Sequence, residues 1–370
     1  MMAEQSSAIS VQKTEHGIPI RNLWYMLLYA WNETPLSPYW KMVDSDDSPS
    51  LDALLASVLS RTIQQRLRIG LGCNYVPEQR LLRGICGRID ITKSIKQRSF
   101  ERGQAFCRFE EFSINAPMNQ IIRSTLYYLV QAGNFGTEDA RAIELRHRLR
   151  WLTRALHGVD LIELTPDMIR RQQNQRHDHD YRIMLAICEF VLKRRMPTEW
   201  EGYSFRSQLD RDRYTIYRIY QQFVTNFYRH HLQGWAVRPE QPLRWHDEHD
   251  NPFLPRMRPD LILTENARDG RKIVLDTKFT AKSLIQNQWG KEMFDPSHLY
   301  QIYAYLRTQE HRSRQHMEAS GILLYPAVAE ELDEMIPLPN HHIYIECVDL
   351  AASWQHVEQR LMDVVVFKQE

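Results

Sequence analysis

Hydrophobic residues recur every three or four positions through most of the N-terminal half of the chain. This spacing predicts helices at residues 18–32, 51–69, 119–131, 138–155 and 181–195. Two β-prone runs interrupt them, at residues 73–95 and 105–109, and Gly84 and Gly87 in the first run mark a bulge or a close backbone approach. The pattern indicates a mixed α/β domain over residues 18–200, preceded by a disordered lead-in at residues 1–17.

The C-terminal half combines long helical periodicity with short apolar runs typical of strands. We expect helices at 209–232, 296–306 and 351–366, and strands at 321–326, 341–350 and on both sides of a polar turn within 254–279. Residues 197–202 are the expected boundary, so residues 203–370 form a second domain. The predicted fold class is therefore α+β with two domains.

The turn-containing stretch 254–279 carries the clearest candidate chemistry. Asp260 opens its first apolar run, and Asp276 and Lys278 close the second. Side chains two residues apart in a strand point to the same face, so Asp276 and Lys278 should point the same way. The plainer alternative is a surface hairpin with ordinary charges, but an acid at the end of a buried strand needs a partner because burying it unpaired is costly.

The expected hairpin brings these side chains together. Residues 268–270 suit a three-residue loop with Gly270 in the left-handed conformation. That loop would pair Asp260 with Lys278 and Ile262 with Asp276, and paired side chains lie about 5 Å apart. Asp260 and Asp276 then form an all-oxygen site suited to Mg²⁺, and Lys278 can orient or deprotonate an attacking water.

A helix further along adds two polar side chains. Asp295 is a good N-cap and Pro296 a good first helical residue. Gln301 and Tyr305 then stand one turn apart and could position a phosphate or a metal-bound water. Without the hairpin, an amphipathic helix with an aromatic core stripe would be the preferred interpretation. In the order strand, strand, helix with Gln-x-x-x-Tyr, the segment resembles the RecB-like branch of the PD-(D/E)xK nucleases.

The chain departs from the pattern of these nucleases at one position. Many nucleases of this class hold a further metal-binding glutamate on a preceding helix, where this chain has Gln221 and Gln222. Glu240, just before the hairpin, is an alternative ligand. The departure weakens the case for a full two-metal site.

Composition narrows the functional classes. Lys and Arg total 47 against 46 Asp and Glu, for a net charge of +1. Because stand-alone DNA-binding proteins are usually clearly basic, a nuclease of this charge would borrow its hold on DNA from a partner or concentrate its cations locally. Five scattered cysteines fit reduced thiols in a cytoplasmic protein. No apolar run approaches the roughly 20 residues that span a membrane, and no signal-peptide segment begins the sequence.

Several segments run in order from about Ile18 to the C-terminus: IPIRNLWYMLLYAWN, RGICGRIDITKSI, FEEFSINAPMNQIIRSTL, LPRMRPDLIL with VLDTKF, and LYQIYAYL. Together they resemble one family, McrC. McrC is the nuclease subunit of the McrBC modification-dependent (type IV) restriction system. The resemblance implies a PD-(D/E)xK nuclease domain, Mg²⁺, a hexameric AAA+ GTPase partner of the McrB type, and cleavage of double-stranded DNA that contains modified cytosine. It also implies catalytic roles for Asp260, Asp276 and Lys278, supported by Gln301 and Tyr305.

The N-terminal half fits a docking role in such a complex. The chain has no G-x-x-x-x-G-K-[ST] phosphate loop, so we do not expect it to hydrolyse nucleotide. Residues 18–195 are the expected motor-binding part, with Arg83 and Arg88 as candidate contacts or plain surface charges. Two other functions stay open: an autonomous RecB-like DNA-processing nuclease, and a non-catalytic activator of an AAA+ motor.

Overall fold

The computed structural model describes most of the chain in two compact units. The described residues are 17–33, 37–41, 50–136, 139–175, 178–195, 208–245, 251, 253–267, 270–278, 284–286, 292–327 and 333–366. One unit, here called the sheet unit, joins Met1–Asp47 to Ser204–Glu370, and the other, the helical unit, is Ser48–Tyr203. Residues 1–16 of the expected lead-in lie outside the described residues.

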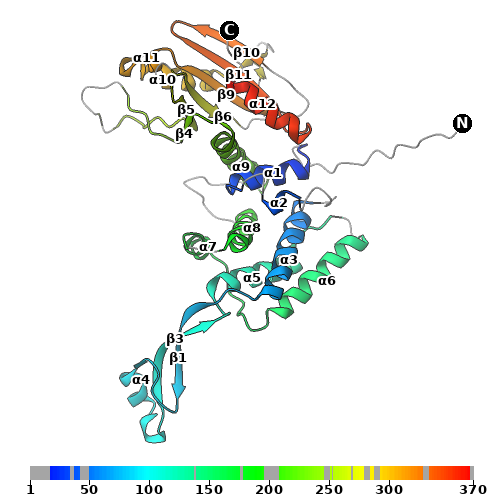
Figure 1. Cartoon of the computed structure of the whole chain (residues 1–370), viewed down its shortest axis with the longest axis vertical. Helices are drawn as coiled ribbons and strands as arrows, with labels where there is room; N and C mark the ends of the chain where they lie inside the picture. Colours follow the sequence, from blue (N-terminus) through cyan, green and yellow to red (C-terminus); the bar gives the residue numbers. More distant parts are fainter. Residues whose placement is uncertain are drawn as a thin grey trace, which may run out of the picture. The chain divides into compact units, whose positions relative to one another are not determined.

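Helices make up the body of the helical unit (Figure 1), and their buried apolar residues form its core. These helices are α3 (Leu51–Ile69), α5 (Pro117–Ala132), α6 (Ala140–Ala155), α7 (Pro166–Gln173) and α8 (His179–Arg195). Local signals set their ends: the Ser50 side chain accepts a hydrogen bond from the Ala53 N–H at 3.1 Å, and Gly70 ends the same helix with a φ of 116°.

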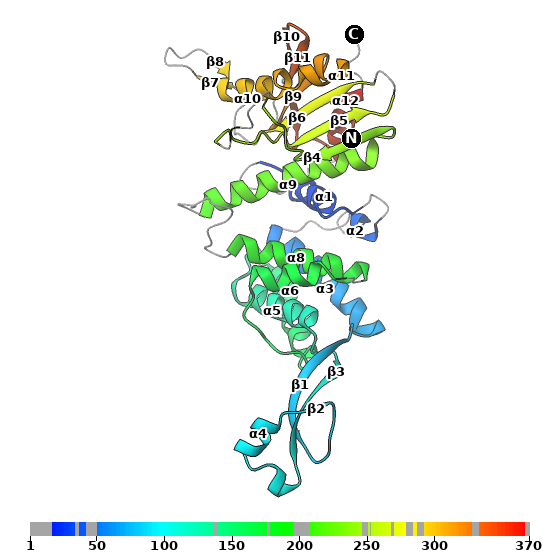
Figure 2. The ribbon, with the colours of Figure 1, turned by 90° about the vertical axis from the view of Figure 1, so that its left-hand side faces the viewer.

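A long arm extends from these helices within the helical unit (Figure 2). Its elements are β1 (Asn74–Leu82), β2 (Arg88–Ile89), α4 (Ile91–Lys96), the 3₁₀ turn η1 (Phe100–Arg102) and β3 (Ala105–Ser113). The strands pair antiparallel in the order β1-β3-β2. We call residues 74–113 the arm.

The arm confirms one prediction and corrects another. A side chain added at Gly87 would lie 2.3 Å from the Arg108 carbonyl oxygen, so this glycine is required by the close approach that the sequence indicated. Residues 91–95, predicted to be β-prone, are helical instead. The Asp90 side chain caps this helix by accepting from the Lys93 N–H at 3.0 Å, a local signal stronger than the β-branched residues that follow.

The sheet unit contains one mixed six-stranded sheet. Its strands are β4 (Trp235–Pro239), β5 (Leu261–Glu265), β6 (Lys272–Thr277), β9 (Ser320–Ala327), β10 (Asp333–Leu338) and β11 (His341–Asp349), in the order β10-β11-β9-β6-β5-β4. The β6–β9 and β9–β11 pairs are parallel and the others antiparallel. A separate ribbon pairs β7 (Leu284–Gln286) with β8 (Glu292–Phe294). The predicted α+β class is confirmed.

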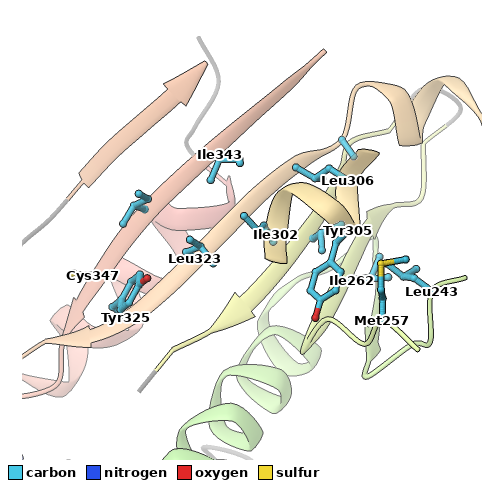
Figure 3. Close-up of a cluster of buried hydrophobic side chains, with 13 residues drawn as sticks. Leu243, Met257, Ile262, Ile302, Tyr305, Leu306, Leu323, Tyr325, Ile343 and Cys347 are labelled. Carbon is cyan, nitrogen blue, oxygen red and sulfur yellow. The ribbon is translucent and has the colours of Figure 1, made fainter. Parts of the chain in front are cut away.

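Helices cover both faces of this sheet. On one face α10 (Pro296–Arg307) packs over β6 and β9, with the 3₁₀ turn η2 (Glu310–Arg312) and α11 (Arg314–Met317) following it. Figure 3 shows Ile302, Tyr305 and Leu306 of α10 beside Ile262 and Leu323 of the sheet. The other side is covered by α9 (Gln208–His231) and α12 (Trp354–Val366), joined by the Tyr228 hydroxyl donating to the Leu361 carbonyl at 2.9 Å.

The first helix of the chain belongs to the sheet unit, which corrects the predicted domain composition. Residues 18–32 were expected in the N-terminal domain, but α1 (Ile20–Ala30), which precedes α2 (Pro38–Lys41), packs against α9. The Asn22 side chain donates to the carbonyls of Leu350 and Ala352, each at 2.8 Å. Nearly every residue of α1 is buried, so it needs a large apolar partner surface, and the sheet unit provides it.

No helix in the part of the chain that the structure describes is both long and apolar enough to cross a membrane.

Candidate active site

The two aspartates selected from the sequence lie at neighbouring strand ends in the middle of the sheet. Asp260 immediately precedes β5 and is 9% exposed, while Asp276 is the penultimate residue of β6 and is 3% exposed. Lys278 follows β6, and its ammonium lies 2.6 Å from a carboxylate oxygen of Asp276. The structure thus brings Asp276 and Lys278 together, and we call these three residues the acid site.

The register of the hairpin differs from the predicted one by two residues. Leu261 pairs with Leu275 and Ile262 with Val274, where the sequence predicted Ile262 opposite Asp276. Continuing that register places Asp260 opposite Asp276 rather than Lys278. Because a shift of two residues keeps every side chain on its face, the acids still meet.

The structural role of Gly270 in this hairpin differs from the predicted one. Gly270 is not among the residues with positive φ, so the expected left-handed turn is wrong. An added side chain there would lie 2.4 Å from the Glu265 carbonyl oxygen, so the glycine is needed because the two backbones approach closely. Residues 268–269 of the expected loop lie outside the described residues.

Both oxygens of the Asp260 carboxylate accept hydrogen bonds. The Gln221 amide of α9 donates to Oδ1 at 2.7 Å, and the Thr277 backbone N–H donates to Oδ2 at 2.7 Å. The Thr277 hydroxyl also donates to Oδ2. Gln221, the residue at the place of an expected glutamate, therefore holds Asp260 in position as a donor.

A second chain of hydrogen bonds runs from Lys278 along α10. The Lys278 ammonium donates to the Gln301 side-chain oxygen at 2.5 Å, and the Gln301 amide donates to the Tyr305 hydroxyl at 2.7 Å. That hydroxyl donates to the Arg258 carbonyl at 3.2 Å. The structure joins the two residues of the predicted Gln-x-x-x-Tyr pair to the acid site through Lys278.

Burial dominates the electrostatics of the acid site. It raises the pKa of Asp260 to about 7, with the nearby charge of Asp276 adding to the increase and the hydrogen bonds from Thr277 opposing it. Burial likewise raises the pKa of Tyr305 to about 12, and the charge of Asp276 contributes. Two carboxylates in this setting repel one another, and a divalent cation would relieve that repulsion.

Two further residues lie at the site and were not selected from the sequence. Tyr217, one helical turn before Gln221 on α9, is hydrogen-bonded to the Thr277 side chain, and burial and the charges of Asp260 and Asp276 raise its pKa. His298 of α10 has its Nδ1 2.8 Å from the Tyr325 hydroxyl. Burial and the charge of Lys278 lower its pKa. The spacing of His298 and Gln301, one turn apart, is the only sequence signal that could have pointed to His298.

The other residues considered as metal ligands are less well placed at the acid site. Glu240 lies close, with a carboxylate oxygen 3.4 Å from the Gln221 amide, but its side chain is 52% exposed. Gln222, the next residue on this helix, is exposed. Among the described residues no group of three or more His, Cys, Asp or Glu side chains could hold a metal ion. A cation at the acid site would therefore take two carboxylates and complete its shell with water or phosphate oxygens, as Mg²⁺ commonly does.

The sequence matches known restriction proteins. Residues 6–326 match the family model described as McrBC 5-methylcytosine restriction system component. The chain is 27% identical over 353 residues to the type IV methyl-directed restriction enzyme EcoKMcrBC of Escherichia coli K12, covering 94% of this chain and 97% of the relative.

A solved structure shares the fold. It is a refined half-complex from a tetradecameric assembly of Thermococcus gammatolerans McrB AAA+ hexamers with bound McrC. The match has a TM-score of 0.55 and 14% identity, and covers 94% of this chain and 76% of the other. The predicted family is confirmed, and this chain belongs to the McrBC 5-methylcytosine restriction system components.

Proposed function

We propose that this chain is the Mg²⁺-dependent DNA endonuclease subunit of a McrBC-like restriction complex. It cleaves double-stranded DNA containing methylcytosine and stimulates the GTPase of a McrB-like AAA+ hexamer. The observation that carries the proposal is the acid site, where Asp260, Asp276 and Lys278 meet at adjacent strand ends and connect to Gln301 and Tyr305.

The donor set suits the proposed cofactor. Asp260 and Asp276 would hold Mg²⁺, since hard oxygen ligands are the ones it prefers. When bound, the ion supplies Lewis-acid stabilisation of charge on the phosphate and lowers the pKa of water. Gln221 and Thr277 keep the Asp260 carboxylate in one orientation, so little reorganisation is needed before the reaction.

Lys278 is placed to contact the reacting groups. An ammonium has three donors, and two of them point to Asp276 and Gln301. The remaining N–H can contact a phosphate oxygen or the attacking water. Gln301, held in turn by Tyr305, fixes the lysine against the flexibility of its stem.

The arm supports the docking part of the proposal. It exposes several large apolar side chains: Tyr75, Ile85, Ile91, Ile95, Phe100 and Phe112 are each at least 40% exposed. Such an accumulation on a projecting element marks a protein-binding surface. Arg83 and Arg88 are also exposed there and remain the candidate contacts to the motor.

The direct test mixes the chain with its cognate motor, Mg²⁺, GTP and methylated or unmethylated DNA. We expect cleavage of methylated DNA, loss of cleavage in Asp276→Ala, and retained GTPase stimulation by that variant. Continued cutting by Asp276→Ala would refute the acid site. Efficient cleavage without any motor would favour the autonomous nuclease, and GTPase stimulation without cleavage by the wild-type chain would favour the non-catalytic activator.

A further inference from the structure

A small pocket with a cationic lining lies on the α10 side of the sheet. Its volume is about 120 Å³. Four basic side chains from four different elements line it: Arg238 of β4, Lys272 of β6, Arg312 of η2 and His316 of α11. Gln241 and Gln309 add amides, and Tyr305 closes one side. We call this the cationic pocket.

No carboxylate among the described residues forms an ion pair with these basic side chains. The Lys272 ammonium donates to the Thr264 hydroxyl at 3.3 Å, Arg312 donates to the Gln309 side-chain oxygen at 3.1 Å, and the His316 Nδ1 lies 2.7 Å from the Ser313 hydroxyl. Lys272 and Arg312 therefore bond to neutral partners, and their positive charge, like that of Arg238, is not compensated by a described carboxylate, while His316, with its lowered pKa, is a neutral hydrogen-bonding group.

Repulsion between the basic groups adds to burial in lowering the pKa of two members. Burial lowers the pKa of Lys272, and the charges of Arg238 and Arg312 lower it further. Burial lowers the pKa of His316 to about 4, with Lys272 and Arg312 contributing. Like charges gathered in a hollow with a low-dielectric wall concentrate positive potential, and an anion would relieve it.

The sheet register sets the position of the pocket relative to the acid site. Arg238 pairs with Ile262, which pairs with Val274, so all three stand in one row across the sheet. Asp276 is two residues further along β6 on the same face, about 7 Å away at the usual rise of a strand. Tyr305 links the two places, because it lines the pocket and is hydrogen-bonded to Gln301.

We infer that the cationic pocket binds a phosphate group of the DNA, one next to the phosphodiester cleaved at the acid site. This inference rests on the proposed nuclease function. The pocket, with a volume of about 120 Å³, is large enough to admit a phosphate group. Amide and guanidinium donors are the groups that hold phosphate oxygens without reading bases.

The test measures DNA binding rather than cleavage. The full chain carrying Asp276→Asn is assembled with its motor, and the salt dependence of its DNA affinity is determined with and without Lys272→Met and Arg312→Gln. Each lost phosphate contact should reduce the magnitude of the log–log salt slope by about 1. Arg314→Gln is the matched control, since Arg314 is 75% exposed on the same helix as His316 and does not line the pocket.

Three further experiments identify which phosphate occupies the cationic pocket. A neutral methylphosphonate at a single internal position should abolish the difference between wild type and pocket variants if the ligand is a backbone phosphate. A difference only between 5′-phosphorylated and 5′-hydroxyl ends would assign the pocket to a strand terminus. Inorganic phosphate that competes equally with wild type and pocket variants would show that it binds elsewhere, against the inference.

The outcomes distinguish this inference from the nuclease proposal. If Asp276→Asn abolishes cleavage but the pocket variants keep the wild-type salt slope, the pocket assignment is wrong and the nuclease proposal stands. Arg238→Gln serves as a control for misfolding, because it changes an exposed side chain on an edge strand. It should also reduce the salt slope of DNA binding. Should Asp276→Asn still cleave, the nuclease proposal itself fails.

Discussion

The acid site and the arm differ in the burial of their functional side chains. At the acid site the carboxylates are buried and every functional group has a partner within the sheet unit. The arm instead presents its apolar side chains to solvent, with Ile91 and Ile95 exposed by 60% and 62%. Under the proposed function, the first region would carry out the chemistry and the second would be buried by a partner protein. Variants in each should therefore fail in different assays.

The largest expected effect is at Lys278. Lys278→Met removes a charged donor aimed at the reacting groups, and we expect DNA cleavage to fall by about 10²–10⁴-fold, the range for a positioned acid or base. GTPase stimulation should be unchanged, because the arm is untouched. Lys193→Met, in an ion pair on α8, is the control and should cleave normally. Equal loss of both activities by Lys278→Met would erase the distinction between the two regions.

The reciprocal change is in the arm. Ile91→Asp combined with Ile95→Asp should weaken GTPase stimulation and motor binding by at least about tenfold, since charges replace apolar contacts at an interface. Ile143→Asp on α6, also exposed but outside the arm, is the matched control. Titration of the motor with each variant measures the affinity. Wild-type stimulation by the double variant would show that the arm does not dock.

A smaller effect is expected at Gln221. Gln221→Glu replaces the amide donor to Asp260 by a third carboxylate, so we expect Mn²⁺ or Ca²⁺ to bind about tenfold more tightly, because affinity rises with ligand charge. Calorimetry on the full chain measures this without cleavage. Gln222→Glu adds the same charge one residue away on the exposed side and should leave the affinity unchanged. Identical affinities for the two variants would place the metal away from Asp260.

The last prediction concerns the pH dependence of stability. The folded-state pKa of Asp260 is raised to about 7, above the usual value of about 3.9. Between these values the folded state binds more protons than the unfolded state, so without metal the unfolding free energy falls as pH rises. Thermal melts of wild type and Asp260→Asn should differ in slope between about pH 4 and 7. Parallel slopes would contradict the raised pKa.

Sequence reasoning located the acid site because its signals are local. Alternation along β6 places Asp276 and Lys278 on one face, and helical spacing places Gln301 and Tyr305 one turn apart, whatever the rest of the fold does. The predicted hairpin register was wrong by two residues, but a shift of two keeps each side chain on the same face, so the prediction of the acid site was unaffected. The short apolar run at residues 321–326 was likewise predicted from its composition and is part of β9.

The missed features depend on contacts between distant segments. The Gln221 amide donates to Asp260 across 39 positions of the sequence. The family resemblance placed Gln221 near the site, but neither segment predicts that its amide is a donor to Asp260. The assignment of α1 to the sheet unit rests on packing with α9 and α12, and its own amphipathic pattern does not specify a partner. β10 was missed because most of its residues are exposed, so it lacks the apolar alternation that predicts a strand.

The hydrogen bond from the Asn22 side chain to the Leu350 carbonyl has consequences for folding during synthesis and for the design of truncated fragments. The two residues are 328 positions apart, so at synthesis rates of about 5–20 residues per second α1 waits between about 16 and 65 s for its partner. The helical unit can mature in that interval as an inserted body. A truncation that starts at the middle of the chain would strip the sheet unit of its own first helix, so an isolated version should splice residues 1–47 onto 204–370.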